Sequence, residues 1–147
     1  MSKKIVEFNL NNERFGLDIN IIKEIIKVPD YTALPKADPS VEGVINLRGK
    51  VIAVVDLAKK LGFPYKETDH NTRIIVIERG SEYVGLRVEG VDEVLTVNEE
   101  DMQKTPGMNA SLDAEMLEGI IVEEEGMLII MDIDKIISVE EASKLKG

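Results

Sequence analysis

An internal repeat constrains the fold of this chain of 147 residues more than any other feature of its sequence. A shift of 69 residues aligns the N-terminal segments with the middle of the chain, and a shift of 76 aligns the later ones. The matched segments are 5–8 with 74–77, 16–17 with 85–86, 41–45 with 117–121 and 56–57 with 132–133. Chance similarity between strands is the alternative, since Val, Ile, Leu and Gly are abundant. The preserved order favours a duplication, with an insertion within 99–112, and so predicts two similar lobes.

Strand-length runs rich in Ile and Val recur along the whole chain and are separated by residues typical of tight turns. The runs are 5–10, 41–47, 51–57, 74–77, 83–88, 117–122 and 127–131. The expected turns are 11–13, 48–50, 79–82 and 124–126, each of which contains Gly or Asn. Many short strands joined by tight turns predict a mainly β fold built from barrels or sandwiches.

Helices are expected to be few and short. One is predicted over 19–26, where apolar residues recur at helical spacing after a possible N-cap, Asp18. Asp56 and Asp132 are expected to cap short turns, and 139–146 suits a terminal helix. Three prolines make 29–40 an extended connection.

The polar stretch 64–72 is the expected division between the two lobes. It places lobe 1 at approximately 12–66 and lobe 2 at approximately 72–137, within one domain of residues 1–147. Whether the first strand stays in its own lobe or is exchanged with the other stays open from the sequence.

The composition excludes several classes of protein. A net charge of −10 with dispersed Lys and Arg disfavours nucleic acid binding. With no cysteine the chain has no disulfides or thiolate metal ligands, which suits a reducing cytoplasm. No apolar run approaches the roughly 20 residues of a membrane-spanning helix, and the first residues lack a signal-peptide pattern. A protein of the cytoplasm without membrane insertion is expected.

Candidate catalytic or metal-binding groups are weakly supported. His70 is the only histidine and lies in a polar stretch, where a solvated loop residue explains it better than a general base. The acidic groups 123–125 and Asp132 with Asp134 fit a solvated turn and a helix cap. We therefore expect no cofactor and no metal. The alternative function from these carboxylates is a small β-barrel that binds or hydrolyses a small cationic ligand.

Arg48 is the charged residue whose position is most informative. Gly49 supplies a tight turn between two strand runs, which leaves Leu47 and Arg48 near a hairpin tip. An ordinary solvated turn and a protein interface both fit, because an apolar residue beside a guanidinium is a common interface pair. Glu24 is a second candidate, although a solvated helix face also explains it, and Asp18 and Asp56 fit caps better than contacts.

The segment 41–57, VEGVINLRGKVIAVVDL, resembles the signature of the CheW family of bacterial chemotaxis coupling proteins. Further resemblance lies in 15–19, 22–25, 84–94 and 117–119, so it covers the chain from about Lys4 to Val139. Two positions depart from the family pattern: Ala53 stands where Pro is frequent, and Ala58 stands where Arg is frequent.

The resemblance implies two five-stranded SH3-like β-barrel lobes packed side by side, with a few short helices and no catalytic activity. It implies an adaptor that links the histidine kinase CheA, through its regulatory domain, to the cytoplasmic tip of methyl-accepting chemoreceptors in arrays at the cytoplasmic membrane. A groove between the lobes is the expected seat of the receptor tip. The residues that match the receptor-contacting surface are Ile22, Glu24, Asn46, Leu47, Arg48 and Gly49. Gly43 matches a position linked to kinase coupling, where backbone geometry is the simpler explanation.

Overall fold

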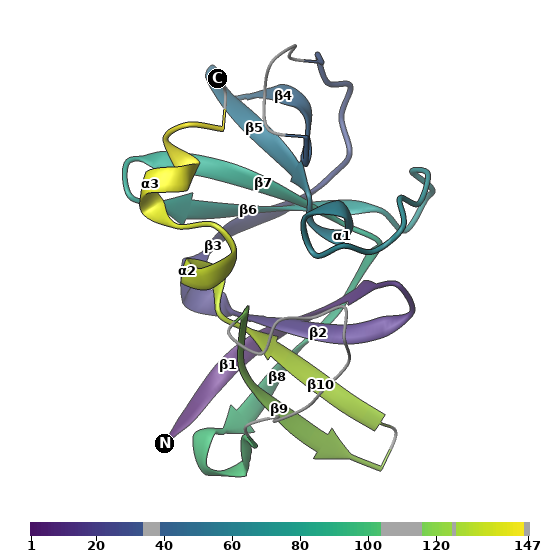
Figure 1. Ribbon diagram of the computed structural model, residues 1–147, viewed down its shortest axis with the longest axis vertical. Coiled ribbons are helices and arrows are strands. Elements are labelled where there is room, and N and C mark those ends of the chain that lie inside the picture. Colours follow the sequence, from purple (N-terminus) through teal and green to yellow (C-terminus); the bar gives the residue numbers. More distant parts are fainter. Residues whose placement is uncertain (34–38, 104–115, 125, 146–147) are drawn as a thin grey trace.

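Ten strands form two five-stranded sheets in the computed structural model, which describes residues 1–33, 39–103, 116–124 and 126–145. Figure 1 shows one sheet in the upper half of the molecule and the other in the lower half. The strands are β1 Ser2–Leu10, β2 Glu13–Asp18, β3 Ile22–Lys27, β4 Val41–Leu47, β5 Lys50–Asp56, β6 Arg73–Arg79, β7 Glu82–Val88, β8 Gly90–Asn98, β9 Leu117–Glu123 and β10 Gly126–Met131. The predicted mainly β class is confirmed.

The two halves of the chain exchange their first hairpins. One sheet has the order β3-β6-β7-β5-β4 and the other has the order β8-β1-β2-β10-β9. Each therefore combines three strands of one repeat with two of the other, and the parallel pairs β5–β7 and β2–β10 join the repeats. We call the first sheet lobe 1 and the second lobe 2.

The exchange corrects the lobe boundaries that the sequence suggests. Segments 12–66 and 72–137 do not correspond to the sheets, because β1 and β2 belong to lobe 2 and β6 and β7 belong to lobe 1. The repeat itself is reproduced element by element: β4 and β5 match β9 and β10 in position, pairing and the bulge near their glycine. Most of the predicted insertion within 99–112 lies outside the described residues.

A backbone bridge closes each sheet at equivalent places. Thr32, after the edge strand β3, exchanges two hydrogen bonds of 3.0 and 2.8 Å with Val44 on the opposite edge strand. Gln103 and Ile120 do the same in lobe 2, at 2.8 and 2.9 Å. Each bridge joins the two edges of its sheet at one point, which shortens the exposed edges that invite aggregation.

Three apolar clusters fill the described part of the molecule. One lies inside each closed sheet, and a larger one lies where the lobes pack together. On β6, Ile74 faces the interior of lobe 1 while Ile75 faces the cluster between the lobes, as the two-residue period of a strand requires. Phe8 and Phe15 stack in the cluster between the lobes with centroids 5.9 Å apart. Burial on both faces explains the continuous apolar runs of these strands.

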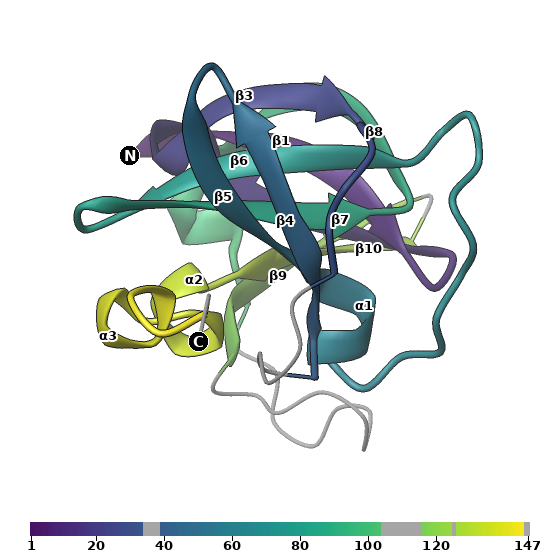
Figure 2. The same ribbon diagram turned by 90° about the horizontal axis from the view of Figure 1, so that it is seen from above.

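Three short helices, α1, α2 and α3, lie beside the junction of the lobes (Figures 1 and 2). The helical segments are η1 Ile19–Ile21, α1 Leu57–Lys60, η2 Glu99–Asp101, α2 Ile133–Ile136 and α3 Val139–Ala142. α1 and α2 are equivalent in the repeat. Ala142 and Leu145 of the C-terminal segment are buried in the cluster between the lobes, so the predicted terminal helix is present but shorter than 139–146. Residues 146–147 lie outside the described part.

The predicted helix over 19–26 is wrong beyond its first turn. Asp18 caps only η1, by accepting a hydrogen bond of 2.9 Å from the Asn20 N–H. Residues 22–27 continue as β3, with alternating half-buried and exposed side chains. Their branched side chains suit a strand, and pairing with β6 satisfies the backbone.

The two predicted aspartate caps behave differently. Asp132 accepts a hydrogen bond from the Asp134 N–H at 3.1 Å and caps α2 as expected. Asp56 precedes α1 without a side-chain cap bond. Its buried carboxylate instead lies 3.7 Å from the buried guanidinium of Arg87, its register partner on β7. Burial raises the pKa of the Asp56 carboxyl, and the Arg87 charge opposes that rise.

We expect both lobes to unfold together, because each holds strands of the other. All three tyrosines, Tyr31, Tyr65 and Tyr83, follow or belong to lobe 1 strands, so tyrosine fluorescence reports that lobe and far-ultraviolet circular dichroism reports both. Phe15→Ala should reduce the free energy of unfolding by about 3–5 kcal/mol. The urea unfolding curves followed by tyrosine fluorescence and by circular dichroism should still coincide. Val94→Ala, at an exposed site, is the control. Separate transitions for the two probes would contradict this expectation.

Arg87→Met should destabilise the protein in a pH-dependent way. It leaves the Asp56 carboxylate buried without a counter-charge, at a cost of about 3–5 kcal/mol. The pKa of the Asp56 carboxyl in the folded protein then rises further above its value in the unfolded chain. The free energy of unfolding therefore falls as the pH increases from the unfolded-state pKa to the folded-state pKa. Urea titrations at pH 5 and pH 7 should show the larger loss at pH 7, and Asp56→Asn in the same background should remove the difference. An equal loss at both pH values would contradict the assignment.

Candidate functional site

The β4–β5 turn holds Arg48 in a backbone conformation that few residues other than glycine adopt. Arg48 has φ 51° and Gly49 has φ 87°, as the two central positions of a type I′ turn require. The Asn46 side chain accepts a hydrogen bond of 2.9 Å from the Gly49 N–H. Asn46 therefore stabilises the turn that positions Arg48.

Arg48 forms an ion pair with Glu24 of β3. β3 and β4 are the two edges of the lobe 1 sheet, and closure of the sheet brings them together; Figure 2 shows the β4–β5 hairpin beside β3. The Arg48 side chain is 73% exposed, whereas the Glu24 side chain is only 26% exposed. Its Oε1 atom is buried without a hydrogen-bond partner among the described residues. Glu24 thus lies on a strand, not on the predicted helix face.

The apolar candidates are less exposed than a hairpin tip suggests. Leu47 is half-buried and packs against the interior cluster of lobe 1. Ile22 is half-buried and packs against the cluster between the lobes. Five of the six predicted residues, all except Ile22, gather around the turn and its ion pair. The exposed side chains of this site, those of Asn46 and Arg48, are therefore polar or charged.

Two neighbouring residues were not predicted. Lys50, at the start of β5, places its Nζ atom 4.3 Å from the ring centroid of Tyr83 on β7. Together with Leu47 and Arg48 they line a cavity of about 240 Å³. Lys50 lies in the expected turn 48–50, which is the signal that could have indicated it, whereas Tyr83 carries no local signal because only sheet pairing brings it near.

Gly43 has a structural reason to be glycine. A Cβ atom there would lie 2.4 Å from the carbonyl oxygen of Thr32, the residue that closes lobe 1 through Val44. A Cβ atom at its counterpart Gly119 would have more room, with Met102 side-chain atoms at 3.1 Å and the Gln103 carbonyl oxygen at 3.4 Å. The close approach of Thr32 therefore gives Gly43 a role in backbone geometry, at the point where lobe 1 closes.

The acidic candidates do not form a common site. Glu123 pairs with Arg14 at 2.6 Å, Asp134 pairs with Arg79, and Glu125 lies outside the described residues. His70 is exposed in a turn. Within the part of the chain that the structure describes, no group of three potential metal ligands converges. These positions do not support the cationic-ligand alternative.

A polar cavity of about 460 Å³ lies at the junction of the lobes. Its lining includes two carboxylates, Glu89 and Asp92, and two cations, Lys66 and Arg73. Each carboxylate already accepts a hydrogen bond: Glu89 from the Asn11 N–H and Asp92 from the Asn9 side chain, both at 2.9 Å. None of the predicted receptor-contacting residues lines this cavity, so the expected site is separate from the cavity between the lobes.

The fold and this site define a double-barrel β protein that presents a charged hairpin turn. A family model described as "CheW-like domain" matches residues 4–141. The chain is 36% identical to a chemotaxis protein CheW of Thermotoga maritima, with 98% of this chain and 92% of the relative covered. It is 33% identical to the Bacillus subtilis protein of the same name, with 95% and 90% covered.

A solved structure shows the same fold. The scaffolding protein TtCheW from Thermoanaerobacter tengcongensis superposes with a TM-score of 0.84 at 35% identity, covering 96% of this chain and 91% of that one. The chain belongs to the CheW-like domain family. Among its described residues, no helix has the length and apolar character needed to cross a membrane.

Gly43→Ala should weaken the Thr32–Val44 bridge that closes lobe 1, and it should do so more than a substitution that only strains the backbone. The new methyl group would displace Thr32, so amide hydrogen exchange at Val44 should accelerate strongly. Gly49→Ala is the matched control: it meets no atom within 4 Å but has φ +87°, and should cost about 1–2 kcal/mol through strain. Unchanged exchange at Val44 in Gly43→Ala would show that the close approach does not need glycine.

Proposed function

We propose that this protein is a non-catalytic chemotaxis adaptor that couples a CheA-type histidine kinase to methyl-accepting chemoreceptors. The observation that carries the proposal is the Arg48–Glu24 pair on the β4–β5 turn, presented by a fold that belongs to the CheW-like family. The relatives are named chemotaxis proteins, and the structural neighbour is described as a scaffolding protein.

The turn suits a protein contact for physical reasons. Arg48 extends from a hydrogen-bonded turn, so little backbone conformational entropy is lost when a partner binds. The half-buried Glu24 holds one side of the guanidinium, which orients the remaining donors. The surface beside the Arg48–Glu24 ion pair is formed by Asn46, Leu47 and Gly49.

The partners are the receptor's cytoplasmic tip at this turn and the kinase regulatory domain at another face. The receptor is helical at its tip, and a charged pair beside apolar surface can orient such a helix. Gly43 would affect kinase coupling indirectly, through the closure of lobe 1. Association with receptor arrays at the inner face of the cytoplasmic membrane would follow from these contacts.

Arg48→Glu should weaken binding to a chemoreceptor signalling-domain fragment by about tenfold or more, because it reverses a charge and repels Glu24. Co-sedimentation with the receptor fragment and a CheA-type kinase measures the effect and tests for the ternary complex. Lys27→Glu makes the same charge change at an exposed site on β3 and serves as control.

The folded state of each variant is checked by its urea transition. Receptor binding by Arg48→Glu that equals that of Lys27→Glu would remove the role given to Arg48. Failure of the wild-type chain to join either partner would remove the proposed function itself.

A further inference from the structure

We propose that Arg87 is an acid-sensitive latch. It holds the connection between the two repeats against lobe 1 while Asp56 is ionised, and releases the connection when Asp56 takes up a proton. The connection comprises residues 61–72, between α1 and β6. The latch acts within the free chain and needs no partner.

The connection is fixed at its two ends by its own backbone. In the described structure, the N–H groups of residues 61–63 donate to carbonyl oxygens of α1, and the Thr72 N–H donates to the Asp69 carbonyl oxygen at 3.2 Å. The buried residues of the connection also lie near these ends, whereas residues 64–70 are exposed. The middle of the connection therefore depends on another attachment to stay against lobe 1.

Arg87 of β7 supplies that attachment. Its Nη2 atom donates to the Lys66 carbonyl oxygen at 2.6 Å and to the Thr68 hydroxyl at 3.0 Å. Its guanidinium carbon lies 4.9 Å from the ring centroid of Tyr65, a distance at which a cation and an aromatic ring attract each other. One buried side chain thus contacts three residues of an exposed segment.

The positive charge of Arg87 is balanced by Asp56. The two side chains are 2% and 1% exposed, and Nη1 of Arg87 lies 3.7 Å from Oδ2 of Asp56. Neither carboxylate oxygen of Asp56 has a hydrogen-bond partner among the described residues, so charge is what holds the pair. A neutral Asp56 would leave a buried guanidinium without a counter-charge, which is strongly unfavourable. Because Arg87 contacts an exposed segment, its guanidinium has a short route to solvent.

Protonation of Asp56 and its attraction to Arg87 oppose each other. The Arg87 charge acts to lower the pKa of the Asp56 carboxyl, although burial has the larger effect and raises that pKa. By linkage, a proton on Asp56 must weaken the hold of Arg87 by the same free energy. Because the pKa of Asp56 is raised, the release takes place at a higher pH than the titration of an exposed aspartate.

The other groups around Asp56 do not replace Arg87 as its counter-charge. Glu42 of β4 also faces Asp56, and its negative charge favours the protonated form of Asp56. The Tyr31 hydroxyl, after β3, donates to Glu42 at 3.3 Å. From α1, the backbone at Lys59 favours the ionised form of Asp56, more weakly than Arg87 does. Glu42 therefore adds to the response to acid.

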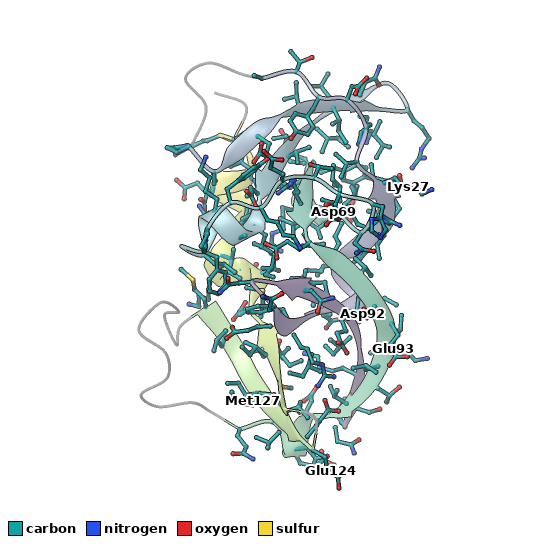
Figure 3. The ribbon with its side chains drawn as sticks, turned by 90° about the vertical axis from the view of Figure 1, so that its right-hand side faces the viewer. Lys27, Asp69, Asp92, Glu93, Glu124 and Met127 are labelled. Carbon is teal, nitrogen blue, oxygen red and sulfur yellow. The ribbon has the colours of Figure 1, made fainter. Side chains whose placement is uncertain are left out.

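Release of the connection would change one wall of the polar cavity at the junction of the lobes. Lys66 and Asn71 of the connection line that cavity, opposite residues that include Asp92 of β8. Figure 3 labels Asp69 of the connection and Asp92, which lie on the same side of the molecule. The bridges that close the two sheets do not involve the connection. The latch therefore alters the junction while both sheets stay closed.

The first test titrates the wild-type chain from pH 7 to pH 4 by NMR. The carbon-13 shift of the Asp56 Cγ atom reports its protonation, and the heteronuclear NOE of the Glu67 and Thr68 amides reports the mobility of the connection. The NOE values should fall with the same midpoint as the Asp56 shift, while far-ultraviolet circular dichroism stays constant. Constant NOE values throughout the titration of Asp56 would overturn the proposal.

The second test uses variants at pH 7. Asp56→Asn imitates the protonated form and should lower the Thr68 NOE to the value of the acidified wild type. Glu67→Gln removes a carboxylate from an exposed site in the same connection and should leave that NOE unchanged. Equal NOE values in the two variants would contradict the latch. If Asp56→Asn does not fold, the wild-type titration still decides.

The third test reads the coupling in the opposite direction. Thr68→Val removes one of the acceptors that hold Arg87, so Arg87 should stay less firmly beside Asp56 and the pKa of the Asp56 carboxyl should rise. Glu67→Gln removes a negative charge and should not raise that pKa. A structural role of Thr68 alone would not move the Asp56 titration, so an unchanged midpoint in Thr68→Val would show that the connection and Asp56 are not coupled.

Discussion

The parallel pairing of β7 with β5, and of β2 with β10, is the constraint on which the structure depends. Each pair joins a hairpin of one repeat to the last two strands of the other. Without it neither sheet has five strands and neither can close through its bridge at Thr32 or Gln103. The Arg48–Glu24 pair depends on that closure, because its residues lie on opposite edges of one sheet.

Seven of the ten strands in the described part of the chain were predicted, because their runs have the alternating or fully apolar pattern that burial on one or two faces requires. The strands β2 and β8 were not among the predicted runs. The exchange of the first hairpins was not predictable from the sequence. The hairpins of the two repeats match so well that the sequence does not specify which sheet each one joins. β3 was mistaken for a helix because Ile19, Ile22 and Ile26 fit helical spacing, while pairing with β6 decided the conformation.

The site was predictable in part. Gly49 and its neighbours predict a tight turn, and the family resemblance indicates Arg48 and Glu24 as site residues. Their pairing, the supporting role of Asn46 and the contact of Lys50 with Tyr83 all depend on which strands become neighbours. Such contacts link residues far apart in the chain, so local sequence patterns cannot reveal them. The burial of Asp56 against Arg87 was missed for the same reason.

The exchange also says something about how such a chain arose. A polypeptide with a single repeat would hold a first hairpin that belongs in another sheet, and its own sheet would lack two strands. It could complete its sheet only by trading that hairpin with a second copy of itself. The connection through residues 61–72 therefore holds the two repeats together covalently, whereas two separate subunits would have to associate to exchange their hairpins. In this sense the molecule has the strand arrangement of a swapped dimer within one chain, and its two hairpin turns differ chemically.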